Sequence, residues 1–134
     1  MANIQMEGLA HIGVFISDIE VSKKFYTEVL DFKVMENATL SSPEGVIKIA
    51  FVKNGDLILE LVQFPNAVKK GDGVVDHFAF KTKNIEGVRA NLEKRGIVFE
   101  EKEITHAPGV GKNGSKWILF RGPDGEHLEL NEQL

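Results

Sequence analysis

The chain has 134 residues, of which 43% are hydrophobic and 27% charged, so a packed globular fold is expected rather than disorder. The formal net charge of −4, without a lysine- or arginine-rich block, argues against nucleic acid as a partner. Cysteine is absent, which excludes disulfides, thiolate nucleophiles and cysteine-rich zinc sites. No apolar run approaches the roughly 20 residues of a membrane span, and residues 1–7 lack the pattern of a signal peptide. We therefore expect a cytoplasmic protein with no membrane partner.

The first half of the chain predicts a strand, a helix and three further strands. Ser17 or Asp18 can cap the helix, and a turn cluster follows at 41–45. The Asn54-Gly55 pair favours the positive φ angles of a tight hairpin. The expected elements are a strand over 9–16, a helix over 19–30 and strands over 32–36, 46–52 and 57–62.

The second half predicts the same order of elements. Asn84 is the expected helix cap and Gly96 the expected helix stop, while the glycine-rich segment 106–115 is predicted to be a loop. The expected elements are a strand over 74–82, a helix over 85–95 and strands over 97–103, 116–120 and 126–131. The predicted organisation is a first module over 1–64, a linker over 65–73 and a second module over 74–134.

A sequence repeat relates the two halves. The segment over 10–20 recurs over 76–86, an offset of 66 residues. A second pair of similar segments, over 57–61 and 126–130, lies at the end of each half. Phe51 and Phe120 each lie nine residues before the repeated glutamate, which predicts that the repeat extends into the hairpins. Each half opens on a histidine and closes on a glutamate, and these four residues are His11, Glu60, His77 and Glu129.

The four repeated residues are predicted to point away from the apolar faces of their strands. Side chains alternate across a strand, so Ile12 and Val14 share a face and His11 lies on the other; the remaining three strands show the same pattern. A lone histidine or glutamate in a strand is more often a hydrogen-bonded or solvated residue than a ligand. Repetition at matching positions instead favours a site for one divalent metal, built from two imidazoles and two carboxylates.

The sequence resembles the vicinal oxygen chelate superfamily, which includes glyoxalase I, methylmalonyl-CoA epimerase, extradiol dioxygenases and fosfomycin- and bleomycin-resistance proteins. The resemblance rests on His11-Ile12-Gly13-Val14, Phe25-Tyr26, Leu59-Glu60-Leu61, Asp76-His77-Phe78-Ala79-Phe80 and the closing run from Phe120 to Leu130 with its Pro-Asp-Gly turn. It implies an α+β fold of two tandem βαβββ modules. Their strands would form a curved eight-stranded mixed sheet, a cup, with the helices on its outer face.

The resemblance also implies a reaction and a set of site residues. His11, Glu60, His77 and Glu129 would hold one divalent metal ion per site, with Zn, Ni, Co or Mn favoured over Fe(II). Four protein ligands resemble glyoxalase I and the epimerase, which shift a proton next to a carbonyl through a metal-stabilised enediolate or enolate. Glu129 is the first candidate for the general base and Glu60 the second. A small-molecule substrate and a homodimer are expected, and the site could lie within one chain or across a dimer.

Two positions argue against glutathione as the substrate. Short bacterial glyoxalases that use glutathione tend to have an arginine four residues after the first histidine and an asparagine four residues after the first glutamate, where this chain has Phe15 and Phe64. The alternatives are a methylmalonyl-CoA epimerase-like enzyme, a non-catalytic small-molecule binding or resistance protein, and a thiol transferase or dioxygenase. His127 shares its strand face with Glu129 and is read either as a group near the substrate or as a rim histidine.

Overall fold

The structure is a computed structural model of the chain and describes residues 4–67 and 71–134. The chain divides into two compact units, Met1–Val68 and Lys69–Leu134. Two short stretches lie outside the described residues. They are residues 1–3, in the N-terminal segment predicted to lack a signal peptide, and residues 68–70, in the predicted linker. The exact limits of the modules and linker stay a prediction.

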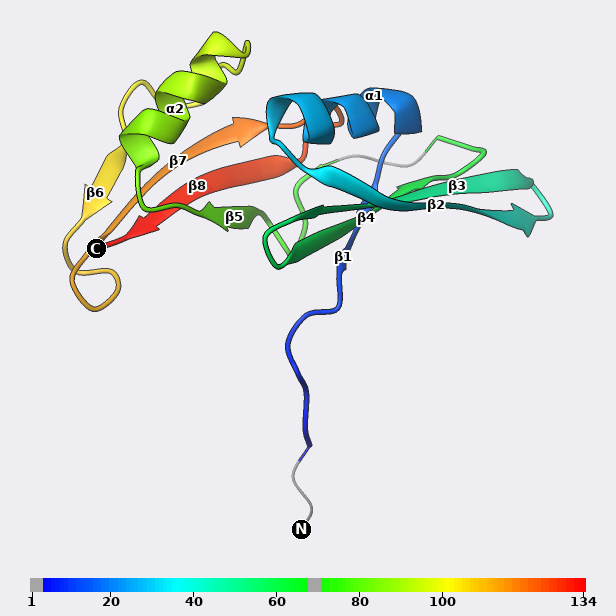
Figure 1. Cartoon of the computed structure of the whole chain (residues 1–134), viewed down its shortest axis with the longest axis horizontal. Helices are drawn as coiled ribbons and strands as arrows, with labels where there is room; N and C mark the ends of the chain where they lie inside the picture. Colours follow the sequence, from blue (N-terminus) through cyan, green and yellow to red (C-terminus); the bar gives the residue numbers. More distant parts are fainter. Residues whose placement is uncertain (1–3, 68–70) are drawn as a thin grey trace. The chain divides into compact units, whose positions relative to one another are not determined.

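The first unit has the predicted strand–helix–three-strand order (Figure 1). Its sheet has the strand order β1-β4-β3-β2, in which β1 and β4 are parallel and the other pairs are antiparallel. The elements are β1 (Ile12–Phe15), α1 (Ile19–Lys24), η1 (Phe25–Val29), β2 (Lys33–Ser42), β3 (Gly45–Asn54) and β4 (Leu57–Gln63). Strand β2 is longer than the sequence predicts, because its mostly polar, exposed residues carry little apolar signal for an edge strand.

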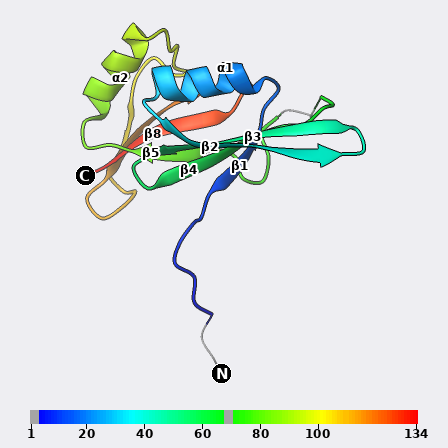
Figure 2. The ribbon, with the colours of Figure 1, turned by 45° about the vertical axis from the view of Figure 1, so that its right-hand side comes forward.

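One apolar face of this sheet is covered by its helix, as Figure 2 shows for α1 over β3 and β4. The core residues between these layers are Val14, Ile16, Ile19, Tyr26, Val52, Leu59 and Leu61, all buried. Asp18 caps α1 as predicted, since its carboxylate accepts the N–H groups of Glu20 and Val21. The helix then widens into the π-helical turn η1, where the Thr27 hydroxyl donates to the Lys23 carbonyl oxygen at 2.7 Å.

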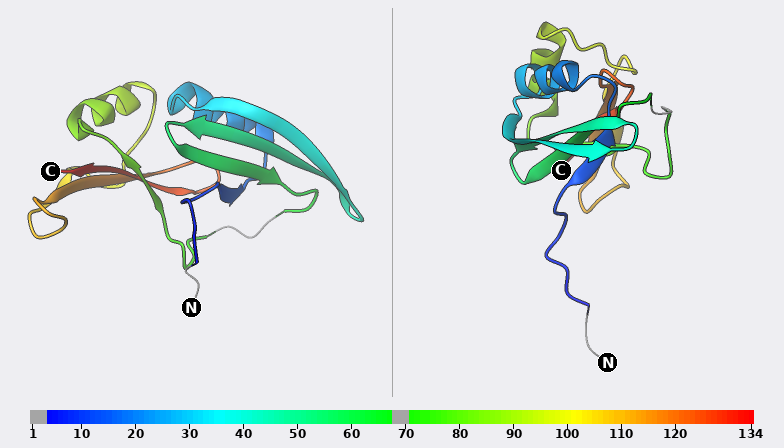
Figure 3. Two further views of the ribbon diagram at one scale, coloured as in Figure 1. Left: turned by 60° about the horizontal axis from the view of Figure 1, so that its bottom comes forward. Right: turned by 90° about the vertical axis from the view of Figure 1, so that its right-hand side faces the viewer.

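The second unit repeats this topology with the strand order β5-β8-β7-β6, in which β5 and β8 are parallel. Helix α2 lies on one side of its sheet (Figure 3), and the Asn84 side chain accepts the N–H of Gly87 as the predicted cap. The elements are β5 (Phe78–Lys81), α2 (Ile85–Lys94), β6 (Thr105–Ala107), β7 (Ser115–Arg121) and β8 (His127–Gln133). The α+β class and the tandem βαβββ modules are thus confirmed as two four-stranded sheets. That the two sheets join into one cup stays a prediction.

The strand predicted over 97–103 is wrong. This segment is irregular, with Val98 86% exposed, and a short strand β6 occurs instead at the start of the predicted loop 106–115. The segment still follows the sheet, because Glu100 N–H donates to the Leu119 carbonyl oxygen and Leu119 N–H donates to the Glu101 carboxylate. One backbone bond and one side-chain acceptor thus take the place of the regular strand pairing that the apolar residues predicted.

Both helices are tied to the final strand of their own unit in the same way. The N–H of Ile19 donates to the Gln63 side chain, and the N–H of Ile85 donates to the Glu132 side chain, each at 2.8 Å. The first N–H groups of a helix have no partner within the helix, so each strand end supplies one of the missing acceptors.

Candidate metal centre

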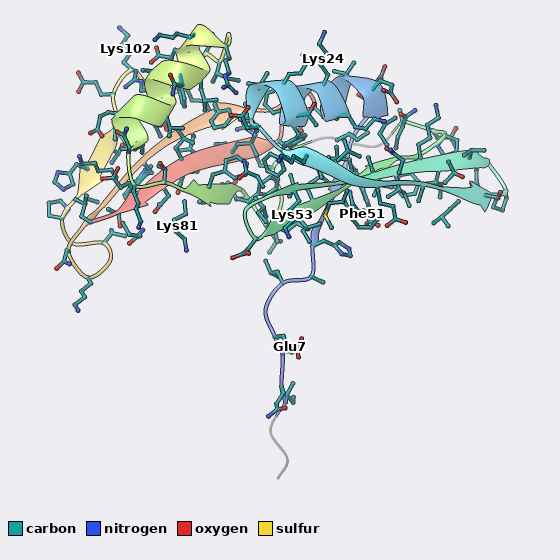
Figure 4. The ribbon with its side chains drawn as sticks, in the orientation of Figure 1. Glu7, Lys24, Phe51, Lys53, Lys81 and Lys102 are labelled. Carbon is teal, nitrogen blue, oxygen red and sulfur yellow. The ribbon has the colours of Figure 1, made fainter. Side chains whose placement is uncertain are left out.

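The first unit brings His11 and Glu60 together on the sheet face that points away from α1. Glu60 is the register partner of Gly13 in β1, and its carboxylate Oε1 lies 3.8 Å from His11 Nε2. The His11 and Phe51 rings make a T-shaped contact with centroids 5.5 Å apart, and Phe51 lies on the side of the sheet opposite α1 (Figure 4). Leu59 and Leu61 are fully buried on the other face, so the predicted alternation of β4 is confirmed.

The second unit brings His77 and Glu129 together in the same manner. Glu129 is the register partner of Ala79 in β5, and its Oε1 lies 3.6 Å from His77 Nε2. The Glu129 side chain is 11% exposed, against 25% for Glu60. Lys81, on the same face of β5, points away from α2 (Figure 4).

A small residue faces the glutamate in both units. A Cβ added at Gly13 would lie 3.7 Å from Glu60 Oε1, an ordinary van der Waals distance. Ala79 carries such a Cβ at the matching position of the second unit. The small residue therefore leaves the space beside the carboxylate open.

The donor atoms of each pair suit a divalent metal ion. Imidazole nitrogen and carboxylate oxygen are both common ligands of Zn, Ni, Co and Mn. Separations of 3.8 and 3.6 Å are too long for direct hydrogen bonds, but two ligands about 2.1 Å from one ion can lie up to about 4.2 Å apart. Each pair therefore fits two ligand positions of a single ion.

The face that carries the candidate ligand is polar in β8 and mostly apolar in β4. In β8 it is polar throughout: Asn131 donates to Glu129 Oε2 at 2.9 Å, and Gln133 donates to Asn131 at 2.6 Å. The corresponding positions of β4 and its end are Ile58, Val62 and Phe64. The carboxylate of Glu129 is thus held by a hydrogen-bonded row, while Glu60 has only the His11 contact among the contacts found in the described residues.

A network of charged and polar groups lies behind His77. Its Nδ1 is hydrogen-bonded to Asp76 Oδ2 at 2.9 Å, and this bond holds the pKa of the Asp76 carboxyl below its usual value of 3.8. His127 follows, with Nδ1 3.3 Å from Asp76 Oδ2 and Nε2 3.4 Å from Glu100 Oε2. Neither nitrogen of this mostly buried ring is aligned for a hydrogen bond within the described residues. Arg121 closes the network by binding Glu100 through Nε.

The outer end of this network is a bidentate ion pair. Both terminal nitrogens of Arg121 donate to the Asp72 carboxylate. This pairing lowers the pKa of Asp72 below 3.8 and raises that of the Arg121 guanidinium. Sequence reasoning missed Asp72, Asp76, Glu100 and Arg121; the only signal was that Asp76 immediately precedes the repeated histidine.

Both units have the hairpin that the repeat predicts, but the equal spacing of Phe51 and Phe120 does not place them at equivalent positions. Phe51 is the register partner of Glu60, whereas Phe120 pairs with Leu128 and is fully buried in the core. The β3–β4 turn has two residues and the β7–β8 loop has five, so the same spacing of nine residues places the two phenylalanines on opposite faces. The residue that matches Phe51 in register is Leu119, the partner of Glu129.

Phe15 and Phe64 form an aromatic pair in the first unit. Their rings meet edge to face with centroids 5.1 Å apart, and Phe15 is 56% exposed. Phe15 lies two residues beyond Gly13 and Phe64 four beyond Glu60, so both share the strand parity of the candidate ligands. An exposed apolar surface thus accompanies the His11–Glu60 pair.

Comparison with known proteins defines the family. The family model described as "Glyoxalase/Bleomycin resistance protein/Dioxygenase superfamily" matches residues 8–130. The chain therefore belongs to this superfamily, as the resemblance predicted.

The individual relatives and the structural neighbour carry different descriptions. The uncharacterized protein YwbC of Bacillus subtilis strain 168 is 34% identical over 123 residues, covering 90% of this chain and 93% of that protein. The lactoylglutathione lyase of Escherichia coli O157:H7 is 28% identical over 131 residues, covering 93% and 92%. A crystal structure of the fosfomycin resistance protein FosX from Listeria monocytogenes, complexed with Mn(II) and sulfate, superposes with a TM-score of 0.71 at 14% identity, covering 97% and 95%.

Within the described residues, no helix is long and apolar enough to cross a membrane.

Proposed function

We propose that this protein is a divalent-metal-dependent lyase or isomerase that shifts a proton next to a carbonyl of a small substrate. The observation that carries the proposal is the repeated pair: each unit places one histidine Nε2 and one glutamate Oε1 within 4 Å of each other, away from the helix-covered face. Likeness to a lactoylglutathione lyase, at 28% identity over 131 residues, supports the same choice.

His11, Glu60, His77 and Glu129 are the proposed ligands of one ion of Zn, Ni, Co or Mn. When bound, such an ion polarises a carbonyl oxygen and stabilises the negative charge that develops as the neighbouring proton leaves. The chain's own residues then hold the substrate, accept the proton and return it.

The contacts of the two glutamates favour different roles for them. Asn131 holds one oxygen of Glu129, and the side chain is nearly enclosed, which suits a fixed ligand. Glu60 is more exposed and lacks such a donor among the described residues, so its carboxylate has more freedom to move and take the proton. We therefore place Glu60 ahead of Glu129 as the general base, the reverse of the order given by the sequence.

The proposed substrate carries an apolar group beside its carbonyl. Phe15, which is exposed, and Phe64, which is half-buried, form an aromatic pair on the ligand side of β1 and β4. These positions carry neither the arginine nor the asparagine of glutathione-using enzymes. An α-oxo compound or an acyl thioester fits this surface, which keeps an epimerase-like reaction as the second candidate. A cytoplasmic homodimer belongs to the same proposal, since symmetric dimers are the commonest oligomers.

Elemental analysis after dialysis, followed by activity assays, tests the proposal. Wild type is expected to retain close to one divalent metal per site, and His77→Ala to lose it, while the matched variant His106→Ala, an exposed histidine in β6, retains it. The metal found is then used in assays with methylglyoxal hemithioacetals and acyl-CoA epimers. A wild type that fails to take up Ni, Co, Zn or Mn overturns the proposal and leaves a metal-free small-molecule binder.

A further inference from the structure

The two halves of the candidate metal centre are supported differently. His77 is preceded by Asp76, whose carboxylate bonds its Nδ1 at 2.9 Å. The residue at the same place before His11 is Ala10, whose side chain has no acceptor. The imidazole of the first unit instead packs against Phe51 in a T-shaped contact.

The two acceptors around His77 compete for its one ring proton when the imidazole is neutral. Asp76 Oδ2 lies 2.9 Å from Nδ1, whereas Glu129 Oε1 lies 3.6 Å from Nε2. Only the first distance is that of a hydrogen bond, so the proton resides on Nδ1 and the Nε2 lone pair faces Glu129. A metal ligand must present such a lone pair, and a carboxylate on the far nitrogen is the usual device that provides it.

His127 limits the freedom of Asp76. Its ring packs edge-on to that of His77, with centroids 6.0 Å apart, and its Nδ1 lies 3.3 Å from the same Asp76 oxygen. Glu100, itself bound by Arg121, stands on the other side of His127. The Asp76 carboxylate is thus bounded by a mostly enclosed ring, although it is half exposed itself.

We infer that Asp76 is a positioning residue of the second half-site, which fixes His77 in the Nδ1–H tautomer and aims Nε2 at the metal. The inference rests on the proposed metal site. It makes the His77–Glu129 half the pre-arranged part of the centre, with Asp76 behind the histidine and Asn131 behind the glutamate.

An alternative use of the same residues is distinguishable. Asp76, His77 and His127 each offer one ligand atom, and these atoms lie within 4.8 Å of one another. Metal binding by this trio would use the His77 nitrogen on the Asp76 side, Nδ1, and would require the proton to leave it. The nitrogen of His77 that responds to metal therefore separates the two arrangements.

Nitrogen-15 NMR of the histidine rings gives the first test. In metal-free wild type above the titration range of histidine, His77 is expected to carry its proton on Nδ1, and added Zn²⁺ is expected to shift Nε2. In Asp76→Ala the ring is expected to revert toward the Nε2–H tautomer that free imidazole side chains prefer. Either an Nε2–H ring in wild type, or a Zn²⁺-induced shift at Nδ1, overturns the inference.

Zn²⁺ affinity gives the second test. Loss of such a carboxylate typically weakens metal binding about 10–100-fold, so Asp76→Ala should fall in this range. The matched variant Asp56→Ala, an exposed carboxylate in the β3–β4 turn, should bind as wild type does. Unchanged affinity in Asp76→Ala refutes the inference alone, whereas a wild type without Zn²⁺ binding refutes the proposed function. Circular dichroism confirms that each variant is folded.

Discussion

Gln63 and Glu132 occupy equivalent positions in the two units, and each accepts the first N–H of its unit's helix at 2.8 Å. We expect Gln63→Ala and Glu132→Ala each to lower the free energy of unfolding by about 1 kcal/mol, because a partly buried helix N–H loses its acceptor. Urea unfolding followed by circular dichroism measures the change. Glu132→Gln keeps an acceptor oxygen and should stay within about 0.5 kcal/mol of wild type; an equal loss in this variant would assign the effect to charge instead.

Substitutions of the two candidate glutamates should differ in their effects on metal content and on turnover. Glu129→Gln is expected to reduce metal affinity more than Glu60→Gln does. The Gln carbonyl oxygen would accept from Asn131, which leaves the NH2 group, a donor and not a metal ligand, on the side of His77. Glu60→Gln should keep more of its metal and lose roughly 10²–10⁴-fold in kcat, the usual contribution of a general base. Steady-state kinetics at saturating metal provide the test, and full kcat in metal-loaded Glu60→Gln contradicts the assignment.

Phe15→Ala should weaken substrate binding with little effect on folding. The ring is 56% exposed and meets Phe64 edge to face, so removing it eliminates apolar contact worth about 1.4 kcal/mol, which is a tenfold rise in Kd or KM. Val21→Ala, also exposed but on helix α1, is the matched control. A KM that responds equally to both substitutions would place the substrate elsewhere.

Acid should weaken the second unit through the Asp72–Arg121 pair. The hydrogen bond from Arg121 lowers the pKa of Asp72 below 3.8, although the Glu100 and His127 side chains also face this network. The pair's contribution is therefore complete above pH 3.8 and is lost as the pH falls through the lowered pKa. Asp72→Asn should lose less stability than wild type between pH 5 and pH 2.5, measured by urea unfolding, and Asp56→Asn should follow wild type.

Alternation along the strands made the candidate ligands predictable. Leu59 and Leu61 buried on one face leave Glu60 on the other whatever the neighbouring sheet does, so the parity argument needed only local sequence. The helix caps Asp18 and Asn84 were predictable for the same reason, since each cap bonds N–H groups two or three residues away.

Features that depend on distant partners were not predictable. Phe120 lies on the opposite sheet face from its counterpart Phe51, because the β7–β8 loop is three residues longer than the β3–β4 turn. The residue spacing within a strand does not reveal this difference in loop length. The segment 97–103 has strand-like composition but joins β7 through one backbone bond and one side-chain acceptor, Glu101. The bond of Asp76 to His77 depends on ring orientation, and the contact of His127 with Glu100 links residues 27 positions apart.

In each module the first strand pairs with the last one: β1 with β4, and β5 with β8. Ile12 pairs with Leu59, 47 residues later, and Phe78 pairs with Leu128 in the second unit. During synthesis, the opening strand of a module cannot form this pairing until the module's last strand has left the ribosome. The histidine and glutamate of each half therefore meet only at the final step, so a nascent or truncated module holds neither a complete sheet nor its share of the metal site.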